Sequence, residues 1–296
     1  MVINDNFTLI RVEPEDVDKD GKCVIPYGVK TIGENACLGN NSLCSVVLPS
    51  SVTEICDSSF ERCDNLKTIN LPQGLTKIGI GAFYHCYSLE NIVIPEGVEI
   101  LREYTFEECS DLECIHLPQS LKEISVNVFA YCDSLTRIEL PNQLERISEA
   151  AFGSSGLIEI TIPSSTQIID ELAFANCSNL KNIAFNNGLE IIHRGAFANC
   201  PELTKVIIPE SVKKINDEVF YDCINLKRAV IPEKTFVSDD AFCGCHKDFK
   251  IERINSKTEK IEFDKSANLF DTLVIGYGSS NKFDKNEWHY IDDEER

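Results

Sequence analysis

Residues 66–86, LKTINLPQGLTKIGIGAFYHC, decide the fold because the chain repeats this pattern along most of its length. Apolar residues flank Pro72 at fixed distances, three of them before the proline and two after it. Phe83 follows the proline by eleven residues and Cys86 by fourteen. A motif that recurs at a fixed period of roughly 20–50 residues indicates a solenoid or another repeat array.

The prolines set the period of the repeat. Nine of ten slots hold a proline, and Asn186 occupies the remaining one. Successive slots lie 23 residues apart, except for one step of 22 that places a deletion between Phe152 and Leu157. The chain is therefore predicted to contain about ten coils, whose slots are Pro26, Pro49, Pro72, Pro95, Pro118, Pro141, Pro163, Asn186, Pro209 and Pro232.

Phenylalanine and cysteine form two further columns with the same step. One coil has no second layer of its own, so only stacking on neighbouring coils can bury its apolar side chains. We therefore predict that both columns are buried, and that the cysteines are reduced thiols, because stacked Cβ vectors run parallel and do not converge. The columns are Phe60, Phe83, Phe106, Phe129, Phe152, Phe174, Phe197 and Phe220, and Cys63, Cys86, Cys109, Cys132, Cys177, Cys200 and Cys223.

Each coil is predicted to contain a strand that ends at the proline slot. In L-x-x-I-x-I-P the apolar residues alternate with others, which is typical of a strand with one buried face. Proline ends the strand because it has no N–H for the ladder. The segment V-x-x-I-G-x-x-A-F-x-x-C predicts a second short strand and then a helical or 3-10 turn. The first strands are expected near residues 45–48, 68–71, 91–94, 114–117, 137–140, 159–162, 182–185, 205–208 and 228–231.

The unit L-x-x-I-x-I-P-x-x-V-x-x-I-G-x-x-A-F-x-x-C resembles the 23-residue leucine-rich repeat of the treponemal and BspA-like family. The resemblance covers about residues 20–246, with departures such as Cys37 in the phenylalanine column. It implies a right-handed leucine-rich-repeat solenoid of about ten coils, with a parallel β-sheet on the concave face and short strands and 3-10 or helical turns on the other side. It also implies adhesion or host interaction, because many family members are surface proteins that bind host or bacterial partners.

The repeat divides the chain into three predicted parts. Residues 1–19 are expected to cap the N-terminal end, and residues 20–246 to form the solenoid. Residues 247–296 break the pattern and are expected to form a C-terminal cap or, alternatively, a partner-binding extension. Within them KIERI, EKIEF and DTLVIGY have the composition of strands.

Composition excludes several classes of function. The chain has 28 Lys and Arg against 48 Asp and Glu, a formal net charge of −20. That balance argues against nucleic-acid binding and against an anionic membrane surface. No apolar run is long enough to cross a bilayer. The acidic N-terminus lacks the features of an export signal and the free thiols suit a reducing compartment, which predicts a cytoplasmic protein, whereas the family resemblance implies the cell surface.

Nothing in the sequence predicts an enzyme, a cofactor or a metal site. The five histidines are scattered, and there is no G-x-S-x-G, P-loop or H-E-x-x-H motif. Cys114 and His116 share one strand face and could pair as thiol and imidazole, but two ordinary surface residues are the preferred interpretation. Cys243, Cys245 and His246 form a compact group, but zinc prefers four ligands and Cys245 lies close to the cysteine column.

The outward side of the predicted strands is the candidate site. Side chains two, four and five residues before each slot point out of the sheet. These positions hold seven Lys or Arg and four Glu, a balance of +3 on a chain of −20. Apolar residues between charges are typical of a protein-binding surface. The candidate ligand-binding residues are Lys181, Lys205, Ile207, Lys227, Arg228, Val230, Arg137, Glu139, His116 and Glu113.

These observations predict a monomeric, non-catalytic scaffold. Its concave face would bind a protein or glycoconjugate partner of acidic character. A second hypothesis is an intracellular structural or regulatory adaptor whose specificity lies in the C-terminal cap.

Overall fold

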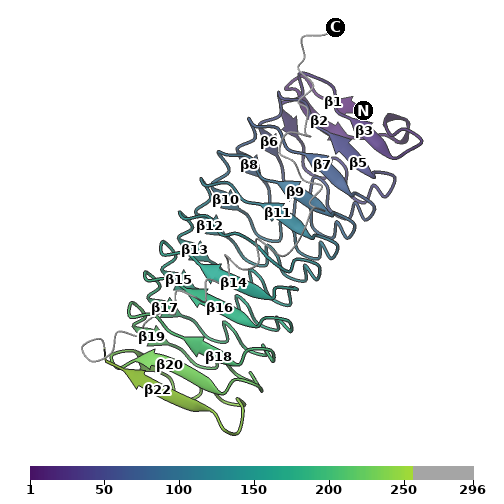
Figure 1. Ribbon diagram of the computed structural model, residues 1–296. Coiled ribbons are helices and arrows are strands. Elements are labelled where there is room, and N and C mark those ends of the chain that lie inside the picture. The colour runs from purple at the N-terminus through teal and green to yellow at the C-terminus, as the bar shows by residue number, and fades with distance from the viewer. Residues whose placement is uncertain (256–296) are drawn as a thin grey trace, which may run out of the picture. The chain divides into compact units, whose positions relative to one another are not determined.

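Residues 1–255, the part of the chain that this computed structural model describes, form a continuous stack of short coils (Figure 1). Most coils contribute one strand to each of two sets of parallel strands, which we call sheet 1 and sheet 2. Paired strands are 22 or 23 residues apart in sequence, so each coil lies directly on the one before it. The predicted solenoid is confirmed, with about eleven turns.

Sheet 1 is formed by the strands that precede the proline slots. They pair in parallel, as Ser45 does with Thr68 and Val46 with Ile69. Their central residues point inward and their flanking residues outward, which follows from the alternating pattern. The strands of sheet 1 are β3 (Lys22–Val24), β5 (Ser45–Val47), β7 (Thr68–Asn70), β9 (Asn91–Val93), β11 (Cys114–His116), β14 (Glu159–Ile162), β16 (Asn182–Phe185), β18 (Lys205–Ile207), β20 (Arg228–Pro232) and β22 (Lys250–Ile254).

Sheet 2 is built from shorter strands that follow the proline slots. Most contain two residues, of which the second is buried, as Ile78 and Ile124 are. Its strands are β2 (Thr8–Arg11), β4 (Thr31–Ile32), β6 (Glu54–Ile55), β8 (Lys77–Ile78), β10 (Ile100–Leu101), β12 (Glu123–Ile124), β13 (Arg146–Ile147), β15 (Ile168–Ile169), β17 (Ile191–Ile192), β19 (Lys214–Ile215) and β21 (Phe236–Val237).

The N-terminal segment covers the first edge of sheet 2. Strand β1 (Val2–Ile3) pairs antiparallel with β2, and β2 pairs in parallel with β4. The parallel ladder therefore begins inside the segment that the sequence predicted as a cap. A short 3-10 helix, η1 (Pro14–Asp16), then leads to the first strand of sheet 1.

The connections after sheet 2 are not the helical or 3-10 turns that the apolar spacing predicted. Within one coil the N–H of Tyr84 donates to the Gly81 carbonyl at 3.0 Å, whereas the N–H of Phe83 donates to the Thr105 carbonyl of the next coil at 3.0 Å. Gly81 and His85 have left-handed φ values of 58° and 59°. A helix needs consecutive right-handed residues, so this alternation gives linked tight turns. No helix in residues 1–255 is long and apolar enough to span a bilayer.

The phenylalanine column is the centre of the core, as predicted. All eight of its side chains have 0% exposure. Adjacent rings stack with centroids 5.1–5.8 Å apart, as Phe106 and Phe129 do at 5.8 Å. The stack continues beyond the eight through Phe242 to Phe249, whose centroids are 4.8 Å apart.

The cysteine column lies beside the phenylalanine rings. All fourteen cysteines of the chain are free thiols in the structure. Each thiol of the column lies within hydrogen-bond distance of a carbonyl in the preceding coil, as Cys109 Sγ does with Phe83 O at 3.3 Å. Burial raises the pKa of Cys63 and of Cys223 to about 12, because the thiolate would be removed from water.

One predicted strand, residues 137–140, does not form. The coil after this segment has the shortened connection. At Gly156 its backbone lies so close to the preceding coil that a Cβ would overlap the Asp133 carbonyl. The N–H of Ile158 donates to Thr136 O at 3.0 Å. The strand pairing of sheet 1 is therefore interrupted between β11 and β14, whereas sheet 2 continues through β12, β13 and β15. Sheet 1 is also interrupted between β7 and β9 and between β16 and β18, and sheet 2 is interrupted between β8 and β10.

Sheet 1 also extends past the predicted end of the solenoid at residue 246. KIERI forms β22, which pairs in parallel with β20. Arg253 occupies the position of the buried Ile231, and its Nη1 donates to Pro232 O at 3.0 Å and to Thr235 O at 2.8 Å. EKIEF and DTLVIGY lie outside the described residues.

Candidate partner-binding face

The sheet-1 face is the surface formed by the side chains that point out of sheet 1, two, four and five residues before each slot. In β18, for example, Lys205 is exposed and Ile207 is partly exposed, while Val206 between them is 2% exposed. The outward columns expected from the sequence therefore lie together on one face.

The apolar column of this face is accessible along part of its length. Val24 and Val93 are 55% and 41% exposed, and Ile207 is partly exposed. Val230 differs from the expectation, because it is only 2% exposed. Its strand lies between β18 and β22, where its register partners are Ile207 and Glu252. Val230 is thus not available to a partner in this structure.

Several cations of the sheet-1 face have a carboxylate partner. Arg137 Nε lies 3.2 Å from Glu159 Oε1 in the next coil. Arg228 Nε donates to Glu252 Oε2 at 2.9 Å. Both pairs are exposed to water, where an ion pair contributes little stability but cancels the local charge. The balance of +3 counted along the sequence therefore overstates the charge that these two arginines present.

The unpaired positive charge is concentrated near the C-terminal end of the stack. Lys205 and Lys227 have no carboxylate within 4.0 Å among residues 1–255, and neither has Lys250. Lys205, Arg228 and Lys250 are in register on three successive strands. Like charges side by side on neighbouring strands repel each other. Together with two paired neighbours, Arg228 beside Glu252 and Lys181 at 4.0 Å from Glu202, these lysines form a group that we call the cationic patch: Lys181, Lys205, Lys227, Arg228 and Lys250.

The middle of the sheet-1 face carries the remaining candidate residues. Cys114 Sγ lies 3.8 Å from His116 Nδ1 on β11. Burial raises the pKa of Cys114, and the carboxylates of Glu139 and Glu113 raise it further. A nucleophilic thiol needs a lowered pKa, so these neighbours act against catalysis.

The Cys243, Cys245 and His246 group is divided between different partners. Cys245 joins the cysteine column, with its Sγ 3.3 Å from Phe220 O. Cys243 is exposed, and its Sγ lies 3.6 Å from Asp240 Oδ1. The two thiols therefore contact different groups.

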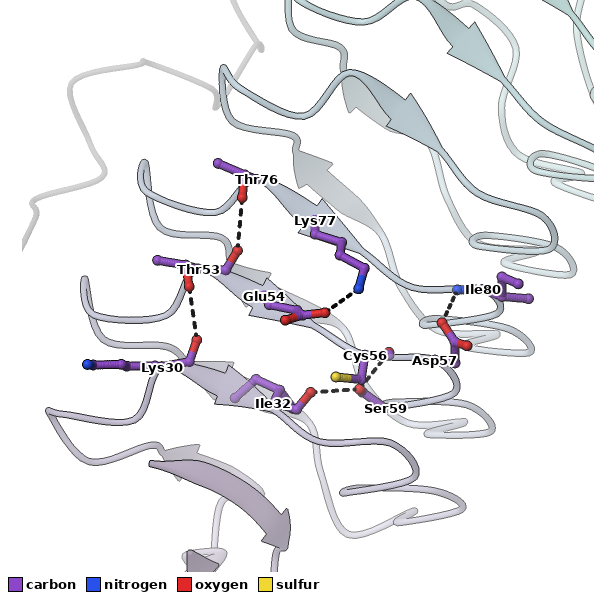
Figure 2. A network of polar contacts seen from close by, with 10 residues as sticks. All are labelled: Lys30, Ile32, Thr53, Glu54, Cys56, Asp57, Ser59, Thr76, Lys77 and Ile80. Carbon is purple, nitrogen blue, oxygen red and sulfur yellow. Dashed lines mark hydrogen bonds and ion pairs between the residues drawn. The ribbon is translucent and has the colours of Figure 1, made fainter. Parts of the chain in front are cut away.

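On sheet 2, polar side chains connect one coil to the next (Figure 2). Lys77 forms an ion pair with Glu54, and the N–H of Ile80 donates to Asp57 Oδ1 at 2.8 Å. The Ser59 hydroxyl lies 3.3 Å from Ile32 O and bonds within the core. These contacts satisfy the polar groups of the stack itself.

A shallow depression of 310 Å³ lies beside sheet 2. Its wall includes Glu123, Arg146, Ser148, Asp170 and His193. Arg146 Nε donates to Asp170 Oδ2 at 2.7 Å, and Ser148 Oγ lies 3.4 Å from Glu123 Oε1. Arg146 and Asp170, and likewise Ser148 and Glu123, are thus engaged with each other.

Comparison with known protein families agrees with this architecture. A family model described as a BspA type leucine rich repeat region, with six copies, matches residues 30–158 and 146–269. These matches cover more than half of the chain. The chain belongs to the BspA-type leucine-rich repeat family. Leucine-rich repeat proteins generally serve as protein-binding, non-catalytic scaffolds.

Several proteins of solved structure are similar to this chain. A leucine rich cell surface protein from Faecalibacterium prausnitzii is 24% identical, with a TM-score of 0.41, over 83% of this chain and 93% of that one. The leucine-rich repeat protein of T. pallidum is 28% identical, with a TM-score of 0.44, over 66% of this chain and 81% of that one. The pneumococcal vaccine antigen PcpA is 18% identical, with a TM-score of 0.42, over 85% of this chain and 82% of that one. A sequence comparison with curated proteins finds no match.

Two features of this BspA-type face were missed from the sequence. Lys250 lies beyond the predicted last coil, because Ile254 replaces the proline that marks the slot. Asn70, in an outward column, uses its side-chain amide to bond Leu48 N at 2.9 Å and Leu48 O at 3.0 Å. The side-chain amide of Asn70 thus completes the ladder. Nothing in the sequence signalled this role, because a residue two positions before a proline slot was expected only to point outward.

Proposed function

We propose that this chain is a monomeric, non-catalytic scaffold that binds an acidic protein through the sheet-1 face. The observation that carries the proposal is the cationic patch, where Lys205 and Lys227 have no carboxylate partner within residues 1–255 of a protein with a net charge of −20. A partner's carboxylates would relieve the repulsion between adjacent cations. Such contacts raise the association rate and confer specificity more than they raise affinity.

A protein partner fits the face better than a glycoconjugate does. Ile207 and Ala184 lie among the lysines, so the patch offers apolar contact between its charges. None of the outward columns contains Phe, Tyr or Trp, the side chains whose flat faces stack on other rings. A sulfated glycan would need only the charges, and the experiment below distinguishes it.

The setting that we propose is adhesion or host interaction, which the family resemblance implies. The alternative is an intracellular adaptor whose specificity lies in residues 247–296, most of which are outside the described residues. A chain that ends at Asn255 separates the two, because it keeps the cationic patch and loses residues 256–296, which are most of the extension.

The direct test is selection of binders from a random peptide display library against the full chain. We expect acidic peptides to be enriched, and we expect Lys205→Glu with Lys227→Glu to abolish that enrichment. The matched control is Lys19→Glu with Lys234→Glu, which reverses two exposed lysines away from the face. Absence of acidic enrichment, or enrichment that survives the face reversal, would refute the proposal.

Two further arms separate the alternatives. Retention on heparin that the face reversal removes, without any selected peptide, would assign the patch to sulfated glycans. Loss of the selected peptides on truncation at Asn255, with the patch intact, would assign binding to the extension.

A further inference from the structure

Three tyrosines lie close together on the connections that lead from sheet 2 back to sheet 1. The rings of Tyr84 and Tyr104, in successive coils, have centroids 6.5 Å apart and planes tilted by 56°. The His85 ring contacts both Tyr84 and Tyr87, with centroid distances of 3.8 Å and 5.3 Å. Tyr104 is 41% exposed and Tyr87 is 38% exposed. A positive charge within about 6 Å of a tyrosine ring centroid is attracted by the ring, so this surface suits a cation.

Glu107 is a buried carboxylate beside these rings. It occupies the turn position of Tyr84 one coil later, and the N–H of His85 donates to the Glu107 carbonyl at 3.0 Å. Glu107 is only 8% exposed. Its Oε1 accepts from Asn127 Nδ2 at 3.0 Å, but no Lys, Arg or His among residues 1–255 lies within 4.0 Å of its carboxylate. A carboxylate held out of water without a counter-ion is destabilising, and a cation bound beside it would remove that cost.

The surrounding turns add further negative charge. They carry seven Asp or Glu against two Arg, a formal charge of −5 over residues 56–64, 79–87, 102–110 and 125–133. Arg62 is already engaged, because its Nε lies 3.8 Å from Glu61 Oε1. Glu108 Oε2 lies 3.3 Å from His85 Nδ1 and accepts the Tyr87 hydroxyl at 3.4 Å. A positively charged partner would therefore meet complementary charge at this surface.

We propose that a site formed by Tyr84, Tyr87, Tyr104, Glu107 and Glu108 binds an arginine side chain of a basic partner peptide. A guanidinium plane can stack on a tyrosine ring while its N–H groups donate to a carboxylate, so Tyr104 and Glu107 supply the two complementary contacts. The lysine ammonium is a compact and strongly hydrated charge without a flat face. Arginine thus suits a site made of rings and carboxylates better than lysine does.

This site does not depend on the acidic-partner proposal. It lies on the connections after β8 and β10, whereas the cationic patch lies on sheet 1 between β16 and β22. The cationic patch carries the opposite charge and would repel an arginine peptide. Acidic and basic peptides can therefore bind, or fail to bind, separately.

The probe is a blocked, fluorescently labelled tri-arginine peptide, titrated into the full chain at about 150 mM salt, which screens distant charges. Fluorescence anisotropy measures the binding. We expect Tyr104→Ala and Glu107→Gln each to weaken binding by roughly three- to thirtyfold, the range for loss of a cation–ring contact or of a charged hydrogen bond. A tri-citrulline peptide, which has nearly the same shape without the charge, should not bind. Tyr104 is exposed and Glu107→Gln keeps an acceptor for Asn127, so circular dichroism should show an unchanged fold.

The matched controls are Tyr221→Ala and Glu210→Gln. Tyr221 is 39% exposed, close to the value for Tyr104, and lies several coils away. Glu210 is exposed, and its replacement removes the same single charge as Glu107→Gln. We expect both controls to bind tri-arginine as the parent chain does. Failure of tri-arginine to bind, or equal binding of tri-citrulline, would overturn the proposal. Binding that survives Tyr104→Ala or Glu107→Gln, or that falls equally in the controls, would overturn it as well.

Discussion

The thiol of Cys86 lies 3.1 Å from the carbonyl oxygen of Phe60, in the coil before it. The same carbonyl accepts the N–H of Cys63 at 3.2 Å, which closes the turn of its own coil. The Phe60 carbonyl oxygen thus contacts both the turn of its own coil and the cysteine side chain of the next coil. This relationship explains why a small residue with a weak donor recurs at that position.

Replacing Cys109 by Ala should destabilise the stack by about 1–2 kcal/mol, since it removes a buried sulfur and its contact with Phe83 O. Urea unfolding followed by circular dichroism measures the change. Cys243→Ala, at an exposed thiol, should stay within about 0.5 kcal/mol of the parent. Equal effects of the two substitutions would contradict a structural role for the column.

Replacing Phe129 by Ala should cost about 3–5 kcal/mol, the usual range for truncation of a core phenylalanine. Its ring stacks on Phe106 and on Phe152, so both neighbours lose contact. Phe236 is 59% exposed and is the matched control, expected to cost about 1 kcal/mol or less. A loss below about 1 kcal/mol at Phe129 would mean that the ring is not buried.

Stability should fall as pH rises above the ordinary thiol pKa of about 8.5. Burial raises the pKa of Cys63 and Cys223 to about 12, so the unfolded chain loses these protons first and alkaline pH favours it. The contribution of the protonated thiols to the free energy of unfolding is fully present below about pH 8.5 and is lost towards about pH 12. The loss is up to about 1.4 kcal/mol per pH unit for each thiol.

Denaturant midpoints at about pH 7, 9 and 10 measure how much unfolding free energy is lost per pH unit. A double variant shows how much of that loss comes from the buried thiols. Cys86→Ala with Cys109→Ala should reduce the loss per pH unit by up to about 2.7 kcal/mol, the share of two thiols. Lysine and tyrosine ionisation is common to both chains and cancels in the comparison. Identical slopes would show that the column does not control alkaline stability.

The shortened connection requires glycine at position 156. A Cβ there would overlap the backbone carbonyl of Asp133, so Gly156→Ala should cost about 1–3 kcal/mol or more. Gly74→Ala is the control, because its nearest neighbour is Ser50 O at 3.7 Å, an ordinary contact. Thermal unfolding of both variants measures the difference, and a neutral Gly156→Ala would remove our explanation for the interrupted ladder.

The repeat and its core could be predicted from sequence because they depend on periodic apolar residues. Pro72, Phe83 and Cys86 and their counterparts defined the coils and their buried side. The turns were mispredicted because apolar spacing does not report φ, and residues such as His85 adopt left-handed φ without being glycine. The charge of the face could not be counted correctly from columns, because Arg228 is neutralised by Glu252, which lies past the last recognised coil.

The interruption at residues 137–140 gives the two sides of the stack different mechanical properties. Sheet 2 continues without a break from β10 to β21 across the same coils, whereas the strand pairing of sheet 1 stops after β11, resumes with β14 and β16 and is interrupted again before β18. At that level sheet 2 supplies a continuous ladder, whereas sheet 1 supplies single hydrogen bonds such as the one from Ile158 N–H to Thr136 O, so bending towards or away from sheet 1 is resisted mainly by sheet 2. A partner that contacts only the coils after the interruption does not touch the paired strands β9 and β11 of the preceding coils. Amide exchange of β9 and β11 on partner binding would then report on whether the whole face or only its C-terminal half is engaged.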